Sequence, residues 1–325
     1  MPRSLALFAL VAVVAGPALA QPRTADPIAR GLRLTDFPRV VPIAPNVYGY
    51  EEIRAPGFTT VSLFVVGTKG VLLADGQGSP PATRRLLEEI RRITPLPVRW
   101  YVVGSDHGDH TAGNSELPRD VTFLVHPASL AQLRRDSAAA VTARARAAAD
   151  AAAKGQPAPE PRMVVVPPQA MTGDATTIDV GGTEVRVLFL GRAHTGGDLS
   201  VYLPRERVLF MSEAYLNRVF PAMRSAYPSE WVATIDRALA LDVARYIPGH
   251  GFIEAGPVSR EELTTFRDAV RQVIAEVTRL RGRGLTVDEA VAQAQWGELG
   301  RWFLAEQQAP VAVRKVWEEL DGRLR

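Results

Sequence analysis

Apolar residues follow two different repeats along this chain, one typical of strands and one typical of helices. From Asn46 to Asp75 the pattern is strand-like, with apolar and β-branched runs at 59–66 and 70–75. Pro80 then begins a segment with apolar residues at helical spacing, and Pro95 ends it. Further short strands are expected at 98–103, 121–125, 176–180, 184–190, 199–203, 208–211 and 244–247. This order predicts an α+β protein, a sandwich of two sheets flanked by helices.

Two helical stretches lie outside this alternation. Residues 129–154 are rich in alanine and predict a long exposed helix, followed by a proline-rich linker at 156–161. This helix either covers the mouth of a site or is a surface insertion without a role. The tail from Glu261 is also helical, with an amphipathic stripe and a capping box formed by Thr286 and Glu289. We expect its large aromatic residues to fix the tail on the main body: Trp296, Trp302, Phe303 and Trp317.

The N-terminus predicts export. Arg3, an apolar run at 5–15 and the small residues Ala18-Leu19-Ala20 form the three regions of a signal peptide. The run is shorter than the roughly 20 apolar residues of a membrane span. We therefore expect a signal peptide at 1–20, a main domain at 21–255 and a helical extension at 256–325 packed on that domain. The expected location is periplasmic or secreted, without membrane insertion after the signal peptide is removed.

Composition narrows the function classes. The 325 residues contain no cysteine, so neither disulfides nor lipid attachment at the cleavage site is expected. The net charge is only +3, and no basic run is interleaved with aromatic residues. Nucleic-acid binding is therefore not expected.

Histidine is rare and concentrated. Four of the five histidines lie in three glycine-containing segments, each after an apolar run. These segments are Ser105-Asp106-His107-Gly108-Asp109-His110, Gly191-Arg192-Ala193-His194 and Pro248-Gly249-His250-Gly251. Imidazole and carboxylate groups together are typical zinc ligands, so the pattern predicts a metal site at an edge where several loops meet. His126 lies outside these segments and is expected to be structural.

These segments resemble the metallo-β-lactamase superfamily, whose hallmark is His-x-His-x-Asp-His on a loop after a strand. The stretch from Ser105 to His110 matches this motif except at its first position. Asp75 is similar to the aspartate of the family's early Leu-x-Asp-x-Gly turn, which we expect to orient a loop or a ligand. The segments around His194 and His250 are similar to its later metal segments. The resemblance implies the αββα sandwich of that family, with one or two zinc ions per chain.

The resemblance implies two unequal metal sites. One set is complete, with Asp109, His110 and His250. The other keeps His107 and His194, while Ser105 stands in place of the family's first histidine. After residues 208–211 the family usually has Gly-Asp with a bridging carboxylate, and this chain has Ser212-Glu213. Glu213 is thus either a metal ligand with a longer side chain or a carboxylate near the site.

The implied function is an exported metallo-hydrolase. Zinc lowers the pKa of its bound water, and the resulting hydroxide would cleave an ester, thioester, lactone or β-lactam carbonyl bond. The partner that this function implies is a small-molecule substrate. Asp109, His107 and His194 are the candidate catalytic residues, because they can ligate metal, orient water or move its proton. The alternative is a non-catalytic metal- or ligand-binding protein of the same fold, in which Ser105 marks the loss of a metal.

Overall fold

A computed structural model describes residues 22–154, 156–157 and 163–324 of the chain. The predicted signal peptide and most of the predicted linker at 156–161 lie outside the described residues. Within the described part, no helix combines the length and the apolar character that crossing a bilayer requires.

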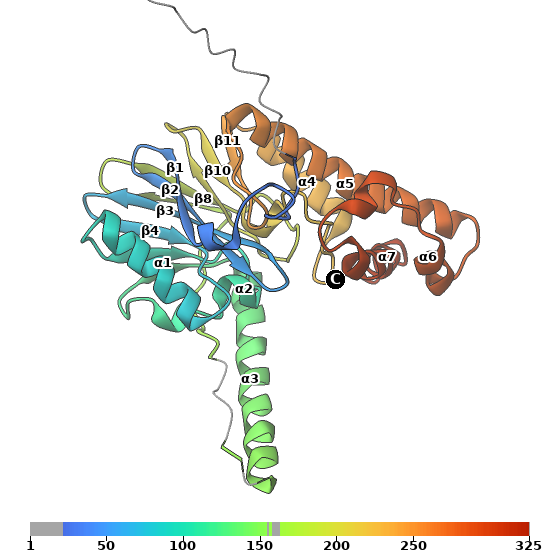
Figure 1. The fold of residues 1–325 in the computed structure, drawn as a ribbon, viewed down its shortest axis with the longest axis horizontal. Coiled ribbons are helices and arrows are strands. Elements are labelled where there is room, and N and C mark those ends of the chain that lie inside the picture. Colours follow the sequence, from blue (N-terminus) through green and yellow to red (C-terminus); the bar gives the residue numbers. More distant parts are fainter. Residues whose placement is uncertain (1–21, 155, 158–162, 325) are drawn as a thin grey trace, which may run out of the picture.

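Two sheets form the centre of the molecule (Figure 1). The first has the strand order β1-β2-β3-β4-β5-β6, and the second has the order β11-β10-β9-β8-β7. The strands of the first sheet are β1 (Arg39–Ala44), β2 (Val47–Arg54), β3 (Phe58–Gly67), β4 (Gly70–Ala74), β5 (Val98–Val102) and β6 (Thr122–Leu124). Those of the second are β7 (Ala175–Asp179), β8 (Glu184–Leu188), β9 (Ser200–Leu203), β10 (Val208–Phe210) and β11 (Arg245–Ile247). The strands β4, β5 and β6 pair in parallel, as do β10 and β11, whereas the other pairs are antiparallel.

Helices cover both outer faces of the two packed sheets. The inner faces meet in one apolar core, with residues such as Leu63 and Leu72 from one sheet and Val201 and Phe210 from the other. Helix α1 (Pro80–Ile93) packs on the outer face of the first sheet. Helices α4 (Pro228–Leu239) and α5 (Gly256–Gly282) cover the outer face of the second. This is the predicted αββα sandwich.

The helical tail packs on α4 and on the second sheet rather than standing apart. It consists of α5, α6 (Val287–Gln293), a 3₁₀ turn (Gly297–Arg301) and α7 (Ala305–Leu320). The predicted capping box at Thr286 and Glu289 is present. The ring of Phe303 lies 5.3 Å from Phe58, and Trp296 lies 5.4 Å from Phe220. These aromatic residues do fix the tail on the body, as expected.

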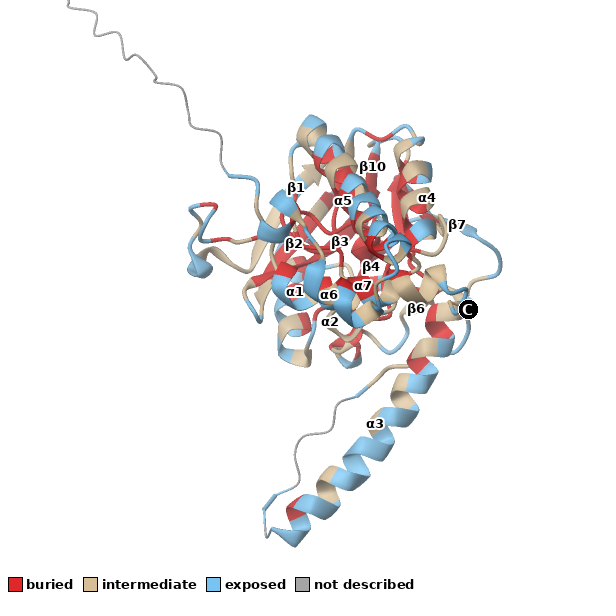
Figure 2. Cartoon of the chain, turned by 90° about the vertical axis from the view of Figure 1, so that its right-hand side faces the viewer, coloured by how far each residue is buried: buried red, intermediate tan, exposed pale blue. Residues whose placement is uncertain are grey.

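Helix α3 (Pro127–Ala153) projects from the body and is largely exposed beyond its first turns (Figure 2). His126 caps its N-terminus, because its Nδ1 accepts a hydrogen bond from the Ala128 amide at 3.2 Å. Its N-terminal part is anchored by Leu130 and Leu133, which belong to the apolar cluster on the outer face of the first sheet. The exposed helix and the structural role of His126 agree with the sequence-based expectation.

Candidate metal centre

The segments that follow four strands, β5, β8, β10 and β11, deliver the predicted site residues to one edge of the sandwich. His107 directly precedes the short helix α2 (Gly108–Thr111), which follows β5 and carries Asp109 and His110. Glu213 lies in a 3₁₀ turn (Ser212–Ala214) after β10. The remaining two histidines are His194, between β8 and β9, and His250, after β11. The structure thus brings together all six residues that the sequence singled out.

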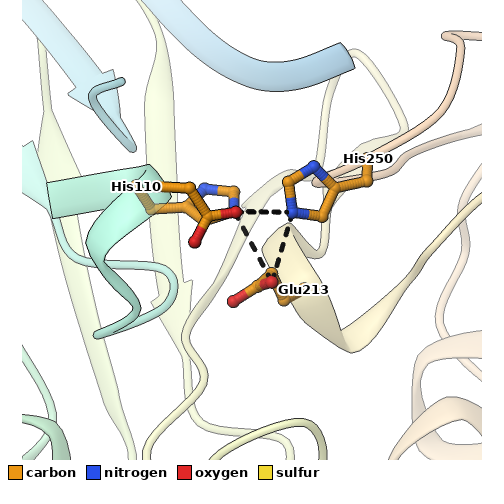
Figure 3. A group of neighbouring side chains, drawn as sticks. His110, Glu213 and His250 are labelled. Atoms are coloured by element: carbon orange, nitrogen blue, oxygen red, sulfur yellow. Dashed lines mark hydrogen bonds and ion pairs between the residues drawn. The ribbon is translucent and has the colours of Figure 1, made fainter. Parts of the chain in front are cut away.

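The first group contains Asp109, His110, Glu213 and His250. Figure 3 labels three of them, His110, Glu213 and His250. The Nε2 atoms of His110 and His250 face each other at 3.3 Å. The His250 Nε2 atom also lies 3.0 Å from Asp109 Oδ2 and 3.2 Å from Glu213 Oε1. One potential ligand atom from each residue lies within 4.8 Å of all the others. Three of the four residues are buried, and Asp109 is partly exposed.

The second group contains His107, His194 and the same glutamate. His107 Nδ1 lies 3.1 Å from His194 Nε2 and 3.0 Å from Glu213 Oε2. His194 Nε2 lies 3.2 Å from Glu213 Oε1. The Glu213 carboxylate therefore stands between the two groups and contacts both. The sequence left the position of this side chain open, and the structure places it at the centre.

Ser105, at the position of the family's first histidine, contacts this carboxylate. Its hydroxyl donates a hydrogen bond of 2.5 Å to Glu213 Oε2, and the residue is fully buried. The same hydroxyl accepts a hydrogen bond from the His107 amide at 3.3 Å. Ser105 thus orients the glutamate and the histidine turn.

The charges of the two groups are strongly coupled. Burial by itself would raise the pKa of Glu213, but the surrounding histidines hold it well below its ordinary value. Burial would lower the pKa of His107 and of His250, but the neighbouring carboxylates outweigh it and raise both to about 9. Burial dominates at His194 and lowers its pKa. A negative carboxylate is thus surrounded by imidazoles that can bind either protons or a cation.

Contacts behind two of the histidines fix which ring nitrogen faces the centre. Asp75 Oδ2 lies 2.9 Å from His110 Nδ1, which directs Nε2 inward. The Nδ1 atom of His250 lies 2.7 Å from the Thr59 carbonyl, which can only accept, so this nitrogen donates. Metal-binding histidines are commonly oriented by such partners. The position of Asp75 agrees with the orienting role expected from the sequence.

Close backbone approach brings Glu213 and His250 together. A Cβ atom on Gly249 would lie 2.5 Å from the carbonyl carbon of Ser212, so a larger residue would push the two loops apart. Ser212 itself has a φ of 47°, a left-handed conformation that costs energy in a residue with a Cβ. Its hydroxyl donates to Asp75 Oδ2, which stabilises the turn. The direction of Glu213 thus depends on tertiary contacts of its neighbour.

The two groups fit divalent metal ions. Each combines imidazole nitrogen with carboxylate oxygen, a donor set suited to zinc and other transition metals. Two pairs of ring nitrogens face each other: His107 Nδ1 and His194 Nε2 at 3.1 Å, and the Nε2 atoms of His110 and His250 at 3.3 Å. In each pair, a hydrogen on one nitrogen can bond to the other, so one nitrogen donates and only one accepts. A cation placed between the donor atoms would satisfy both nitrogens. Ser105 adds no charged ligand to the second group.

Three further residues contact the centre and were not found from the sequence. Arg54 at the end of β2 places its Nη1 3.1 Å from Asp109 Oδ2. Trp231 of α4 packs its ring 5.2 Å from that of His194, and Ser225 Oγ lies 3.1 Å from His107 Nε2. None belongs to a motif, and each reaches the site from another part of the fold. No local sequence signal could have identified them.

Two cavities flank the turn that carries His107 and Asp109. One, of about 730 Å³, lies between this turn, helix α3 and residues 224–227. The other, of about 690 Å³, is lined by Asp109, Arg54 and the start of α1. Helix α3 therefore forms one wall of a cavity beside the site. From the sequence alone, the helix could also have been a surface insertion without a role.

The comparison with known families agrees with this geometry. The profile of the metallo-β-lactamase superfamily matches residues 55–250, more than half of the chain. The chain belongs to the metallo-β-lactamase superfamily. The profile extends from the end of β2 to the last predicted histidine ligand, and so contains both groups.

Two curated relatives match at low identity. The α subunit of a 2,4-dinitroanisole O-demethylase from Nocardioides sp. (strain JS1661) is 24% identical over 191 residues, 58% of this chain and 52% of the relative. A linear primary-alkylsulfatase from Pseudomonas sp. (strain ATCC 19151) is 24% identical over 257 residues, 70% of this chain and 48% of the relative. The chain thus spans about half the length of these relatives.

Solved structures share the fold. A stereoselective inverting sec-alkylsulfatase from Pseudomonas sp. superposes with a TM-score of 0.68 and 17% identity, covering 90% of this chain and 51% of that one. A metallo-β-lactamase from Pontibacter korlensis gives a TM-score of 0.56 and 19% identity, covering 72% of this chain and 98% of that one. Both superpositions confirm the predicted fold class.

Proposed function

We propose that this protein is an exported, zinc-dependent hydrolase that cleaves an ester, thioester, lactone or β-lactam carbonyl bond of a small molecule. The observation that carries this proposal is the Glu213 carboxylate shared by two nitrogen-and-oxygen donor groups beside two cavities. Family membership supports hydrolysis in general. The signal-like N-terminus supports export to the periplasm or medium.

The chain supplies the ligands and the groups that handle protons. His107, His194 and Glu213 would hold one metal, and Asp109, His110 and His250, with the same glutamate, would hold the other. Bound zinc supplies Lewis acidity and makes water a better nucleophile at neutral pH.

Asp109 is the residue best placed to orient water and accept its proton. Burial and the Glu213 charge would raise the pKa of Asp109, but the contacts with His250 and His110 lower it. Its carboxylate is therefore ionised at neutral pH, and it lines one of the two cavities.

Sulfate-ester hydrolysis is the second candidate. It is favoured by the match to a linear primary-alkylsulfatase, which spans 70% of this chain. The oxygen atoms of a sulfate ester would bind the same metal ions as a carbonyl oxygen, so this candidate uses the same centre. A non-catalytic metal-binding protein would have the same centre but would consume no substrate.

A substrate panel tests the proposal. Purified protein is assayed with ester, thioester, lactone, β-lactam and alkyl sulfate substrates, with and without a chelator, and again after zinc is restored. We expect hydrolysis of at least one class that is lost with chelator and regained with zinc. In an Asp109→Asn variant turnover should fall much more than thermal stability, because the residue lies outside the apolar core. Metal binding without hydrolysis of any substrate would instead identify a binding protein.

A further inference from the structure

Arg54 occupies a fixed position between the candidate metal centre and a cavity. Its Nη1 atom lies 3.1 Å from Asp109 Oδ2, and its guanidinium carbon lies 5.3 Å from the centre of the Phe58 ring. Phe58 is buried and in turn packs its ring 4.9 Å from that of His250. The guanidinium is thus held between two residues that contact the centre. Among the described residues, no other Lys or Arg forms an ion pair with either donor group.

The free donors of Arg54 border the cavity of about 690 Å³. A guanidinium has five N–H donors, and the one acceptor that contacts Arg54 in the described part of the chain is Asp109. Its side chain is 38% exposed, so an incoming molecule can reach it. Arg85 lines the same cavity, but its guanidinium is already bound to Glu52.

Metal binding changes the charge balance at Arg54. In the structure the Asp109 carboxylate is the counter-ion of this arginine. A cation bound by Asp109, His110 and His250 would neutralise that carboxylate, and the arginine would then lack a counter-ion of its own. A positive group at a partly desolvated wall favours an anion, and the planar guanidinium matches the two oxygens of a carboxylate or sulfate.

We propose that Arg54 binds an oxyanion of the substrate or product in this cavity and selects substrates that carry a negative group. This inference rests on the proposed function for the bond that is cleaved, whereas the anion site itself does not depend on it. Arg54 also positions Asp109, so its loss affects every substrate to some extent. If Arg54 binds anions, its loss should weaken the binding of anionic ligands more than that of neutral ligands.

Direct binding tests the site without turnover. Calorimetry measures the affinity of the zinc-loaded protein for glutarate and, separately, for inorganic sulfate, which distinguishes the two oxyanions. Arg54→Met should lower the affinity for the preferred anion roughly tenfold or more, which is the effect expected when a hydrogen-bonded charge is lost. Arg54→Lys should keep part of the affinity, because it keeps the charge but not the fork. The matched control is Arg84→Met on α1, which removes an exposed arginine that pairs with Glu116 outside this cavity.

Kinetics provides the second arm. The ratio of kcat/KM for an ester with a free carboxylate to that for its neutral analogue should fall about tenfold in Arg54→Met. An equal loss for both esters would overturn the proposal and leave Arg54 only a positioning role. Equal anion affinity in wild type and Arg54→Met would overturn it as well. Anion binding that depends on Arg54, without hydrolysis of any substrate in the panel, would support the site and contradict the proposed function.

Discussion

Glu213 shows how far single residues could be interpreted from the sequence. The histidines and Asp109 were recognisable because their spacing follows a family motif. Glu213 departs from that motif, and its direction is set by the left-handed backbone of Ser212 and by the hydroxyl of Ser105. Both are tertiary features that the local sequence does not determine. The sequence therefore supplied the candidates, and the fold was needed to place the carboxylate between the two groups.

Ser105 offers a test of the second donor group. Ser105→Ala removes the hydrogen bond to Glu213 with little change in volume, so zinc affinity of the His107/His194 group should fall roughly 10-fold or more, as expected for a lost orienting contact. Ser105→His should raise its metal content, because it adds an imidazole beside two existing ligands. Competitive zinc titration measures both effects. Unchanged affinity in a folded Ser105→His variant would show that position 105 does not face this metal.

Zinc affinity should depend on pH at the level of individual histidines. In the metal-free protein His107 and His250 have a pKa of about 9, so both carry a proton at neutral pH. Zinc binds only neutral imidazole, so binding at pH 7 releases protons, and affinity rises as pH increases toward about 9. Calorimetric titration in buffers of different ionisation enthalpy measures the released protons. A binding enthalpy that is the same in every buffer would contradict the raised pKa values.

At the scale of elements, the periodicity of apolar residues identified most strands and helices but missed the edge strand β1. Helix α1 begins at Pro80 as expected, and the central strands match their predicted segments within a few residues. Strand β1 was missed because it contains Pro42 and lies at the edge of the sheet with only partial burial. Edge strands show weak alternation, since neither face is fully buried.

Helix α3 provides the prediction at this scale. Its alanine residues 139, 140, 143 and 147 lie on one side of the helix and line the larger cavity. Ala143→Trp should obstruct that cavity and lower kcat/KM several-fold for bulky substrates more than for small ones. Ala145→Trp is the matched control, because Ala145 is exposed and does not line the cavity. Equal kinetics of the two variants would show that α3 is not a wall of the substrate site.

For the whole molecule, the helical extension shares one apolar core with the second sheet. Leu263, Phe266 and Val270 of α5 belong to the same cluster as Trp231 and Tyr246. Each such side chain contributes about 1.5–3 kcal/mol when buried. Several of them together equal the whole stability of a typical domain, about 5–15 kcal/mol. We therefore expect the main domain and the helical extension, which meet near residue 255, to fold as one unit.

Truncation tests this prediction. A chain that ends at Ala255 would expose the faces of Trp231 and Tyr246, so we expect aggregation or loss of cooperative unfolding. The full chain should instead melt in a single transition, followed by circular dichroism. If the truncated protein were soluble and melted within a few degrees of the full chain, the extension would be a separate unit.

The central claim is a metal centre built around Glu213, and zinc retention tests it most directly. Elemental analysis after zinc loading and dialysis should find about one zinc per chain in the wild type, because the Asp109/His110/His250 group is the more complete. Glu213→Gln keeps the size of the side chain but removes its charge, and should retain well below one zinc per chain. Glu230→Gln, on a partly exposed glutamate paired with Arg192, is the control and should match the wild type. Equal zinc in wild type and Glu213→Gln, or no retained zinc in either, would contradict the account.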